Sequence, residues 1–167
     1  MHLPNIALYG KSGSGKSTVA AYLVTRHKYI HCSAGRICRQ ICRELFDSED
    51  RAILNAFNDA VRRIDPMVWL RVAKKAINRG QPVVFDSMRF ETDRLYFKAL
   101  DFQLWRIDCP ETKRRERLTL RGQIFEVTDE LHPGEVELEN STFDRTFTND
   151  SSNIEDLHKQ IDAALSS

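Results

Sequence analysis

Hydrophobic residues follow two patterns along this chain. Short apolar runs predict five strands, at residues 6–9, 28–33, 82–86, 102–108 and 143–148. Between these runs, apolar residues recur every three or four positions, which predicts helices at 16–27, 34–45, 49–62, 66–79, 91–100, 110–122 and 151–165. Strands that alternate with helices are typical of a parallel sheet covered on both faces. We therefore expect a three-layer α/β/α fold with a five-stranded parallel sheet.

Local signals mark several helix ends. Asp65 before Pro66 is typical of a helix start, and Gly80 stands where a helix would stop. Ser152 and Glu155 have the spacing of a capping box. Residues 123–142 are acidic, contain one Pro and one Gly, and show little periodicity. We expect this segment to form a loop or a mobile flap.

Length, charge and cysteine spacing limit the functional classes to which this chain could belong. The 167 residues fit one domain, 1–167, and the formal net charge of +1 gives no overall field for a nucleic acid polymer or a membrane surface. No apolar stretch reaches the roughly 18 residues that span a bilayer. The four cysteines lack zinc-site spacing. We expect a cytoplasmic protein, monomer or homodimer, with a small-molecule partner.

One polar segment has no role in packing. After the first apolar run, GKSGSGKS fits the pattern G-x-x-x-x-G-K-[ST] of a P-loop, with a strand before it and a helix after it. Glycines let successive backbone N–H groups line a nest for phosphate, and the helix start adds its positive end. Lys16 would reach the β- and γ-phosphates of ATP, and Ser17 would bind Mg²⁺. The expected nucleotide-binding residues are Gly10, Ser12, Gly13, Ser14, Gly15, Lys16, Ser17 and Thr18.

The strand that ends in Asp86 separates three classes of P-loop protein. A GTPase would carry Asn-Lys-x-Asp, which the chain lacks. A hydrolytic ATPase has a second acid that orients water, whereas Ser87 follows Asp86 here. Asp86 can hold the Mg²⁺ shell or receive a hydroxyl proton. This arrangement favours a kinase, and an ATPase or nucleotide-sensing protein without an acceptor remains the alternative.

A cluster of arginines follows the fourth predicted strand. Arg114, Arg117 and Arg121 are spaced i, i+3 and i+7, so they share one helix face. An enzyme that joins two phosphates needs cations around both of them. The acidic residues of 126–139 could neutralise this face when no nucleotide is bound. The role of His132, which stands in that segment, is left open.

The order of these motifs resembles a known family. GKSGSGKST, VVFDSMRFETD, ETKRRERLTLRG and FDRTFTNDSSNIEDL together look like the nucleoside monophosphate kinase group, and are most similar to deoxynucleoside monophosphate kinases. That family has a strand ending in D-x-x-R-F with an acid soon after, as Asp86, Arg89, Phe90 and Asp93 stand here. The resemblance implies ATP-dependent transfer of a phosphoryl group to a (deoxy)nucleoside monophosphate.

The resemblance also implies roles for individual residues. Arg39, in an acceptor-binding helical region of about residues 33–80, and Arg89, beyond that region, would bind the acceptor's phosphate. Asp86 would lie near that phosphate and Mg²⁺. The arginine-rich helix would belong to a mobile lid of about residues 111–140. In it Arg114 would bind the nucleotide, and Arg117 and Arg121 would act on the transferring phosphoryl group. Asn149 and Asp150 would lie near the adenine.

The acceptor is the part of the resemblance that the sequence leaves open. Residues 46–65 are more compact than the corresponding region of the longer viral enzymes, and this is where base selectivity should arise. Arg62, Arg63 and Trp69 lie in or near it, but their pattern selects no base. The same architecture phosphorylates dephospho-coenzyme A, shikimate, gluconate and nucleosides, so another small metabolite remains an alternative acceptor.

Overall fold

Five strands form one parallel sheet in the order β2-β3-β1-β4-β5. The computed structural model describes residues 3–77, 80–123, 127–151 and 153–166. The strands are β1 (Ile6–Tyr9), β2 (Ile30–Cys32), β3 (Val83–Phe85), β4 (Gln103–Asp108) and β5 (Arg145–Thr148). The central strand β1 places Ile6 between Val84 of β3 and Gln103 of β4. The predicted five-stranded parallel sheet is confirmed.

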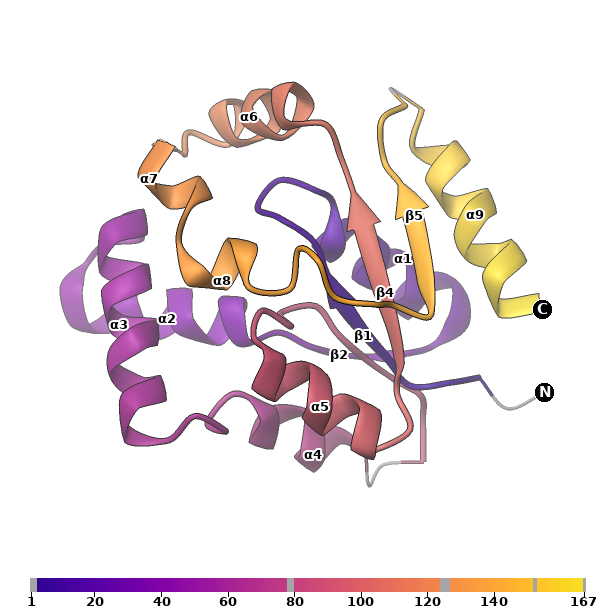
Figure 1. Ribbon diagram of the computed structural model, residues 1–167, viewed down its shortest axis with the longest axis horizontal. Helices are drawn as coiled ribbons and strands as arrows, with labels where there is room; N and C mark the ends of the chain where they lie inside the picture. The colour runs from indigo at the N-terminus through magenta and orange to yellow at the C-terminus, as the bar shows by residue number, and fades with distance from the viewer. Residues whose placement is uncertain (1–2, 78–79, 124–126, 152, 167) are drawn as a thin grey trace.

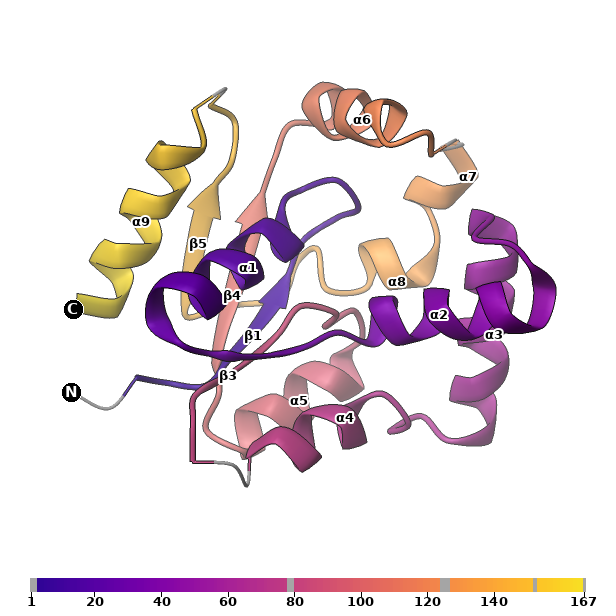
Figure 2. The same ribbon diagram turned by 180° about the vertical axis from the view of Figure 1, so that it is seen from behind.

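Helices cover both faces of the sheet, which confirms the three-layer fold (Figures 1 and 2). Their bounds are α1 Lys16–His27, α2 Ala34–Phe46, α3 Arg51–Ile64, α4 Leu70–Ile77, α5 Glu91–Ala99, α6 Glu111–Leu120, α7 Val127–Glu130, α8 Pro133–Val136 and α9 Ile154–Ser166. Helices α1 and α9 pack on one face, and α4 and α5 on the other. Helices α6 and α7 lie beyond the carboxyl ends of the strands (Figure 1).

The core explains why the central strands β1 and β3 are apolar along their whole length. Alternate β1 residues enter opposite layers, so Leu8 packs among α1 and α9 side chains while Ala7 packs with those of α4 and α5. Trp105 of β4 is fully buried, and its ring centroid lies 4.9 Å from that of Phe147 of β5, with the two rings tilted. Both faces of a parallel sheet are buried in this way. The edge that remains for ligands is the carboxyl end, where the loop after β1 lies.

The structure corrects two local predictions. Residues 66–69 form turns and α4 begins only at Leu70, because the Asp65 carboxylate caps the turn by accepting a hydrogen bond from Met67 N at 2.9 Å. Pro66 is therefore not the first helical residue. The expectation of a loop at 123–142 is wrong for α7 and α8, where proline-initiated and acidic turns are helical.

Two other predicted helix signals are the stop at Gly80 and the capping box of Ser152 and Glu155. Gly80 has a φ of 73°, a left-handed conformation that favours glycine. Ser152, one half of the predicted capping box, lies outside the described residues. The backbone N–H of Glu155 donates a hydrogen bond to Asn153 Oδ1 at 3.0 Å. Helix α9 thus begins with a side-chain cap from a neighbouring residue.

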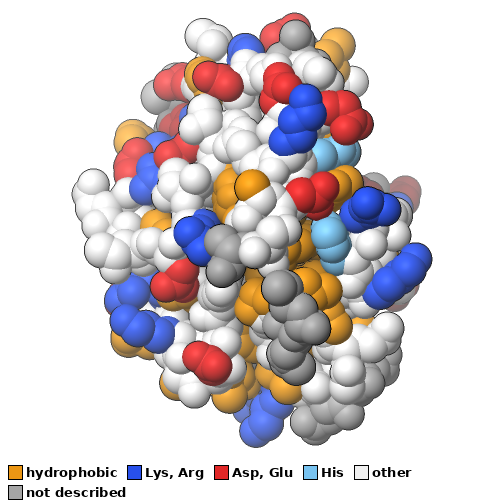
Figure 3. Space-filling view, turned by 90° about the vertical axis from the view of Figure 1, so that its right-hand side faces the viewer, with side chains coloured by type: hydrophobic (Ala, Val, Ile, Leu, Met, Phe, Trp, Pro, Cys, Tyr) orange, Lys and Arg blue, Asp and Glu red, His pale blue; other side chains and the backbone are white. Residues whose placement is uncertain are grey.

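The side of the molecule that carries α9 and both chain ends shows hydrophobic side chains at its centre, surrounded by charged ones (Figure 3). In the same region Tyr22 of α1 stacks on His158 of α9 at 3.8 Å and donates a hydrogen bond to Asp162 at 2.8 Å. None of the helices in the described ranges has both the length and the apolar composition for a bilayer crossing.

Candidate active site

The loop between β1 and α1 has the backbone that its glycines allow. Gly13 and Gly15 have φ angles of 79° and 107°, a region that favours glycine. A Cβ at Gly13 would lie 2.7 Å from the Arg114 carbonyl oxygen, and one at Gly15 would lie 2.3 Å from Asn149 Nδ2. The loop is therefore closely surrounded by α6 and by the end of β5, and no larger residue fits at these two positions.

Lys16 lies at the start of α1, with its ammonium group folded over this loop. Its Nζ donates hydrogen bonds to the carbonyl oxygens of Gly10 and of Lys11, the latter at 3.2 Å. Burial, followed by the nearby positive charge of Arg89, lowers the pKa of Lys16 to about 8. Burial outweighs the nearby carboxylates of Glu135 and Asp86, and a bound phosphate would add negative charge beside the ammonium group, which fits the predicted role of Lys16.

Ser17 and Asp86, the two predicted Mg²⁺ ligands, are brought together. Ser17 Oγ donates a hydrogen bond to Asp86 Oδ2 at 3.2 Å, and Ser87 Oγ donates to Asp86 Oδ1 at 2.7 Å. His31 Nε2 lies 2.9 Å from Asp86 Oδ2. Burial acts to raise the pKa of Asp86, but its contacts with His31 and Ser87 lower it to about 2. A hydroxyl and an ionised carboxylate side by side fit Mg²⁺, which keeps water as its other ligands.

A pocket lined by arginines opens next to this loop. Arg39 of α2 and Arg89, which follows β3, both line it, as the sequence predicts, and Arg51 and Arg62 of α3 join them. Its other lining residues are Ala34, Gly35, Cys38, Leu54, Asn55, Asn58, Trp69, Ser87, His132 and Gly134. The pocket lining thus combines four arginines with apolar and amide side chains.

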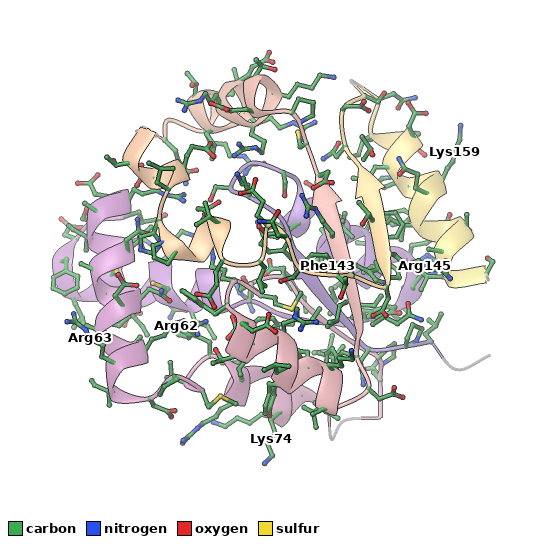
Figure 4. All side chains as sticks on the ribbon, viewed as in Figure 1. Arg62, Arg63, Lys74, Phe143, Arg145 and Lys159 are labelled. Atoms are coloured by element: carbon green, nitrogen blue, oxygen red, sulfur yellow. The ribbon has the colours of Figure 1, made fainter. Side chains whose placement is uncertain are left out.

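Asp93 holds the side chain of Arg62 and the backbone at Arg89. Its side chain is fully buried, and its carboxylate accepts hydrogen bonds from the backbone N–H groups of Arg89 and Phe90, at 3.0 and 3.1 Å. It also binds both terminal nitrogens of Arg62, each at 3.1 Å. Arg62 lies on the inner side of α3 and covers the Phe90 ring, while Arg63 lies on the outer side and is exposed (Figure 4). Asp93 therefore connects α3, α5 and the chain that carries Arg89.

Sequence reasoning missed Glu135 of α8 and Arg51 of α3. Glu135 is 1% exposed and lies between the P-loop and the pocket, in contact with Ser12, Arg51 and Arg89. Burial would raise the pKa of Glu135, but Arg89 and then Lys16 hold it well below the ordinary carboxyl range. The signal that could have revealed this turn is His132 before Pro133, a helix-start pair, with the acid two residues later.

Helix α6 places two of its three predicted arginines on the P-loop. Arg114 Nη1 donates to Ser12 O at 3.1 Å, and Arg117 Nη1 lies 3.4 Å from Gly13 O. Arg121 is exposed at the carboxyl end of α6, so it is not brought to the loop. Arg114 is also paired with Glu130 at 3.0 Å, and Lys11 with Glu139 at 2.9 Å. Acidic side chains of the 126–139 segment thus do contact these cations.

Asn149 and Asp150, expected near the adenine, occupy different environments. Asn149 is buried, and its Nδ2 donates to Ser14 O at 2.7 Å while Arg117 Nη2 donates to its Oδ1 at 3.2 Å. Asp150 is exposed.

A second pocket lies against Lys11, Ser14 and Arg114. Its lining shares no residue with the arginine-lined pocket.

The fold and the loop geometry define a P-loop nucleotide-binding protein with the fold of small-molecule kinases. The chain belongs to the family described as AAA domain, whose family model matches residues 6–131. It is similar to the gluconokinase from Sinorhizobium meliloti 1021, with a TM-score of 0.62, 18% identity, and coverage of 99% of this chain and 94% of that one. This likeness shows the fold.

Two viral relatives extend the comparison. A protein of Acanthamoeba polyphaga mimivirus, whose name proposes that it is a deoxynucleotide monophosphate kinase, is 24% identical over 93% of both chains. The uncharacterized protein ORF76 of Ictalurid herpesvirus 1 is 30% identical over 81% of this chain. The chain spans only 56% of the length of ORF76.

Proposed function

We propose that this protein transfers the γ-phosphoryl group of ATP to a (deoxy)nucleoside monophosphate. The observation that carries the proposal is the pocket in which Arg39, Arg51 and Arg89 lie beside the P-loop. Three guanidinium groups suit an acceptor that already carries a phosphate, because each can bind phosphate oxygens with two parallel N–H groups. The name of the mimivirus relative supports the same reaction.

The walls of the pocket support a nucleotide rather than a small sugar phosphate as the acceptor. Leu54, Cys38 and Trp69 offer an apolar surface for a base, and Asn55 and Asn58 offer amide groups at its edge. Trp69 Nε1 donates a hydrogen bond to Asn58 Oδ1 at 2.8 Å, and Asn58 Nδ2 donates to Asp59 Oδ1 at 3.5 Å, which leaves the second N–H of this amide for a base. A pocket lined by both arginines and apolar side chains matches a phosphate attached to a nucleoside.

On the donor side, the P-loop residues would hold the triphosphate, with Lys16 on the β- and γ-phosphates. Mg²⁺, held by Ser17 and Asp86, would neutralise charge on the phosphate oxygens. Arg114 and Arg117, which contact the P-loop, would be placed for the nucleotide and the transferring phosphoryl group. Arg121 would act there only if the segment 111–140 closes as a lid. The exclusion of water by such closure would favour transfer over hydrolysis.

The proposal is tested by measuring ADP formation with each common ribo- and deoxynucleoside monophosphate, and with none. We expect at least one monophosphate to accelerate ADP release and to appear as its diphosphate. Gluconate, shikimate and dephospho-coenzyme A belong in the same panel, since kinases of such metabolites share the architecture. Turnover of one of these alone, or ADP release that no acceptor changes, would contradict the proposal.

A further inference from the structure

The carboxylate of Glu135 joins the two halves of the candidate active site. On the P-loop side, Glu135 Oε2 accepts a hydrogen bond from Ser12 N, and Oε1 accepts one from Ser12 Oγ, both at 2.7 Å. On the pocket side, Oε1 accepts hydrogen bonds from Arg51 Nη2 at 2.9 Å and from Arg89 Nη1 at 2.5 Å. Arg51 Nη2 also donates to Ser12 Oγ at 2.8 Å. A single buried side chain thus contacts the loop and two of the pocket's arginines.

The backbone of α8 holds this carboxylate in place independently of its charge. Tyr9 Oη, at the end of β1, donates a hydrogen bond to the Glu135 carbonyl oxygen at 3.1 Å. Arg89 Nη1 donates to the Gly134 carbonyl oxygen, also at 3.1 Å, and Leu138 is fully buried in the core. Because α8 is bonded to β1 through Tyr9 and is followed by the buried Leu138, Glu135 can serve as a fixed point for the flexible arginine side chains.

The contacts of Arg89 leave one edge of its guanidinium group for a ligand. Across the described residues, the hydrogen bonds given for this group all use Nη1, to Gly134 O and Glu135 Oε1. The Nε–Nη2 edge is the pair of parallel donors that binds a phosphate in two places. An arginine held at one corner loses less conformational freedom when phosphate binds, so its bond to phosphate is stronger.

We propose that Glu135 is a positioning residue, which holds the guanidinium groups of Arg51 and Arg89 at a fixed place relative to the P-loop. A phosphate bound by these arginines then faces the terminal phosphate held by the loop. The inference rests on the proposed function and identifies what aligns its two substrates. The inference also predicts the direction in which phosphate affinity changes when Glu135 is replaced. If only charge mattered, removal of Glu135 would leave the arginines more positive and would tighten phosphate binding. If Glu135 positions the arginines, its removal weakens phosphate binding.

The test uses inorganic phosphate as the probe, titrated calorimetrically in the presence of saturating ADP and Mg²⁺. For Glu135→Gln we expect phosphate affinity to fall by about tenfold or more, since two charge-assisted hydrogen bonds are lost, and ADP affinity to change by less than about threefold. Glu137→Gln is the matched control, because Glu137 is exposed on the same segment and accepts a hydrogen bond from Glu91 N. The control should match the unsubstituted protein.

Ser12→Ala tests the same link from the loop side without removing a charge. It deletes the hydroxyl that contacts both Glu135 and Arg51, so we expect a smaller loss of phosphate affinity in the same direction. This variant also keeps the inference testable if Glu135→Gln fails to fold.

Three results would overturn the inference. Tighter phosphate binding in Glu135→Gln would mean that Glu135 competes with the ligand. Equal affinities in Glu135→Gln and Glu137→Gln would mean that it has no part in binding. Parallel loss of ADP and phosphate affinity would mean a merely structural role. Because the titration needs no nucleotide acceptor, a protein that phosphorylates no nucleoside monophosphate would refute the proposed function while leaving this test intact.

Discussion

Replacement of Asp93 by Asn should destabilise the protein far more than an ordinary surface change. Asp93 is fully buried and its two oxygens accept four hydrogen bonds, two from the Arg62 guanidinium group and two from the backbone N–H groups of Arg89 and Phe90. Asparagine keeps the shape, but it brings an NH₂ group against these donors and removes the negative charge. The Arg62 side chain, 12% exposed, would then be a largely buried cation without its counter-ion.

The expected cost follows from what is left unpaired. Breaking one partner of a buried ion pair costs about 3–5 kcal/mol. A single domain has a total unfolding free energy of only about 5–15 kcal/mol, so the loss is a large share of it. For a chain of this size, about 1 kcal/mol corresponds to a shift of roughly 2–4 °C, and the variant should melt roughly 6–20 °C lower.

Urea unfolding and calorimetry would measure this cost. Glu91→Gln is the matched control, because Glu91 begins the same helix and its side chain is 42% exposed, against 15% for its partner Arg94. Water screens an ion pair whose carboxylate is exposed, so its loss should cost about 1 kcal/mol. An Asp93→Asn variant within about 1 kcal/mol of the unsubstituted protein, or no less stable than the control, would refute the reasoning. A well-folded variant should also bind phosphate more weakly, since the chain at Arg89 loses its anchor.

Three further predictions concern the P-loop and its neighbour. Lys16→Ala should abolish turnover in an ADP-release assay and leave the circular dichroism spectrum unchanged; normal turnover would rule out the phosphate-binding role. Gly13→Ala should lose more stability in urea than Gly122→Ala, by about 1–3 kcal/mol, because both have positive φ but only the first meets a backbone oxygen; equal losses would contradict the close packing. Glu135 has a depressed pKa among two arginines and Lys16, so its stabilisation is present above the ordinary carboxyl pKa and is lost as the pH falls toward its folded value. Between pH 6 and pH 3 the protein should therefore lose more unfolding free energy than Glu135→Gln, and parallel losses would argue against the depressed pKa.

Signals that are local in the sequence predicted the fold and the phosphate-binding loop. The apolar run before Gly10 and the Gly15-Lys16-Ser17 sequence lie next to each other in the chain, so one short pattern specifies strand, loop and helix. The contact between Ser17 and Asp86 was also predictable. The two residues follow β1 and β3, and the carboxyl ends of adjacent parallel strands meet at one edge of the sheet.

The contacts that complete the site could not be predicted in this way. Glu135 lies 123 residues from Ser12 in sequence, and in an acidic segment it has the pattern of a solvated loop. Only the packing of α8 against β1 buries it. Helix phase placed Arg114, Arg117 and Arg121 on one face, but α6 ends at Leu120, so Arg121 lies beyond the turn that faces the P-loop. Asn149 shows the same limit, because the resemblance implied only a place near the adenine, and the hydrogen bond of Asn149 to the loop backbone was not predicted.

The central claim is that the P-loop presents the terminal phosphate of ATP to a second phosphate held by the pocket's arginines. The most direct measurement follows the γ-phosphate of labelled ATP in the presence of each deoxynucleoside monophosphate. The account predicts that the label appears in a deoxynucleoside diphosphate, and that little inorganic phosphate forms without an acceptor. Label found only in inorganic phosphate, at a rate that no monophosphate changes, would contradict it.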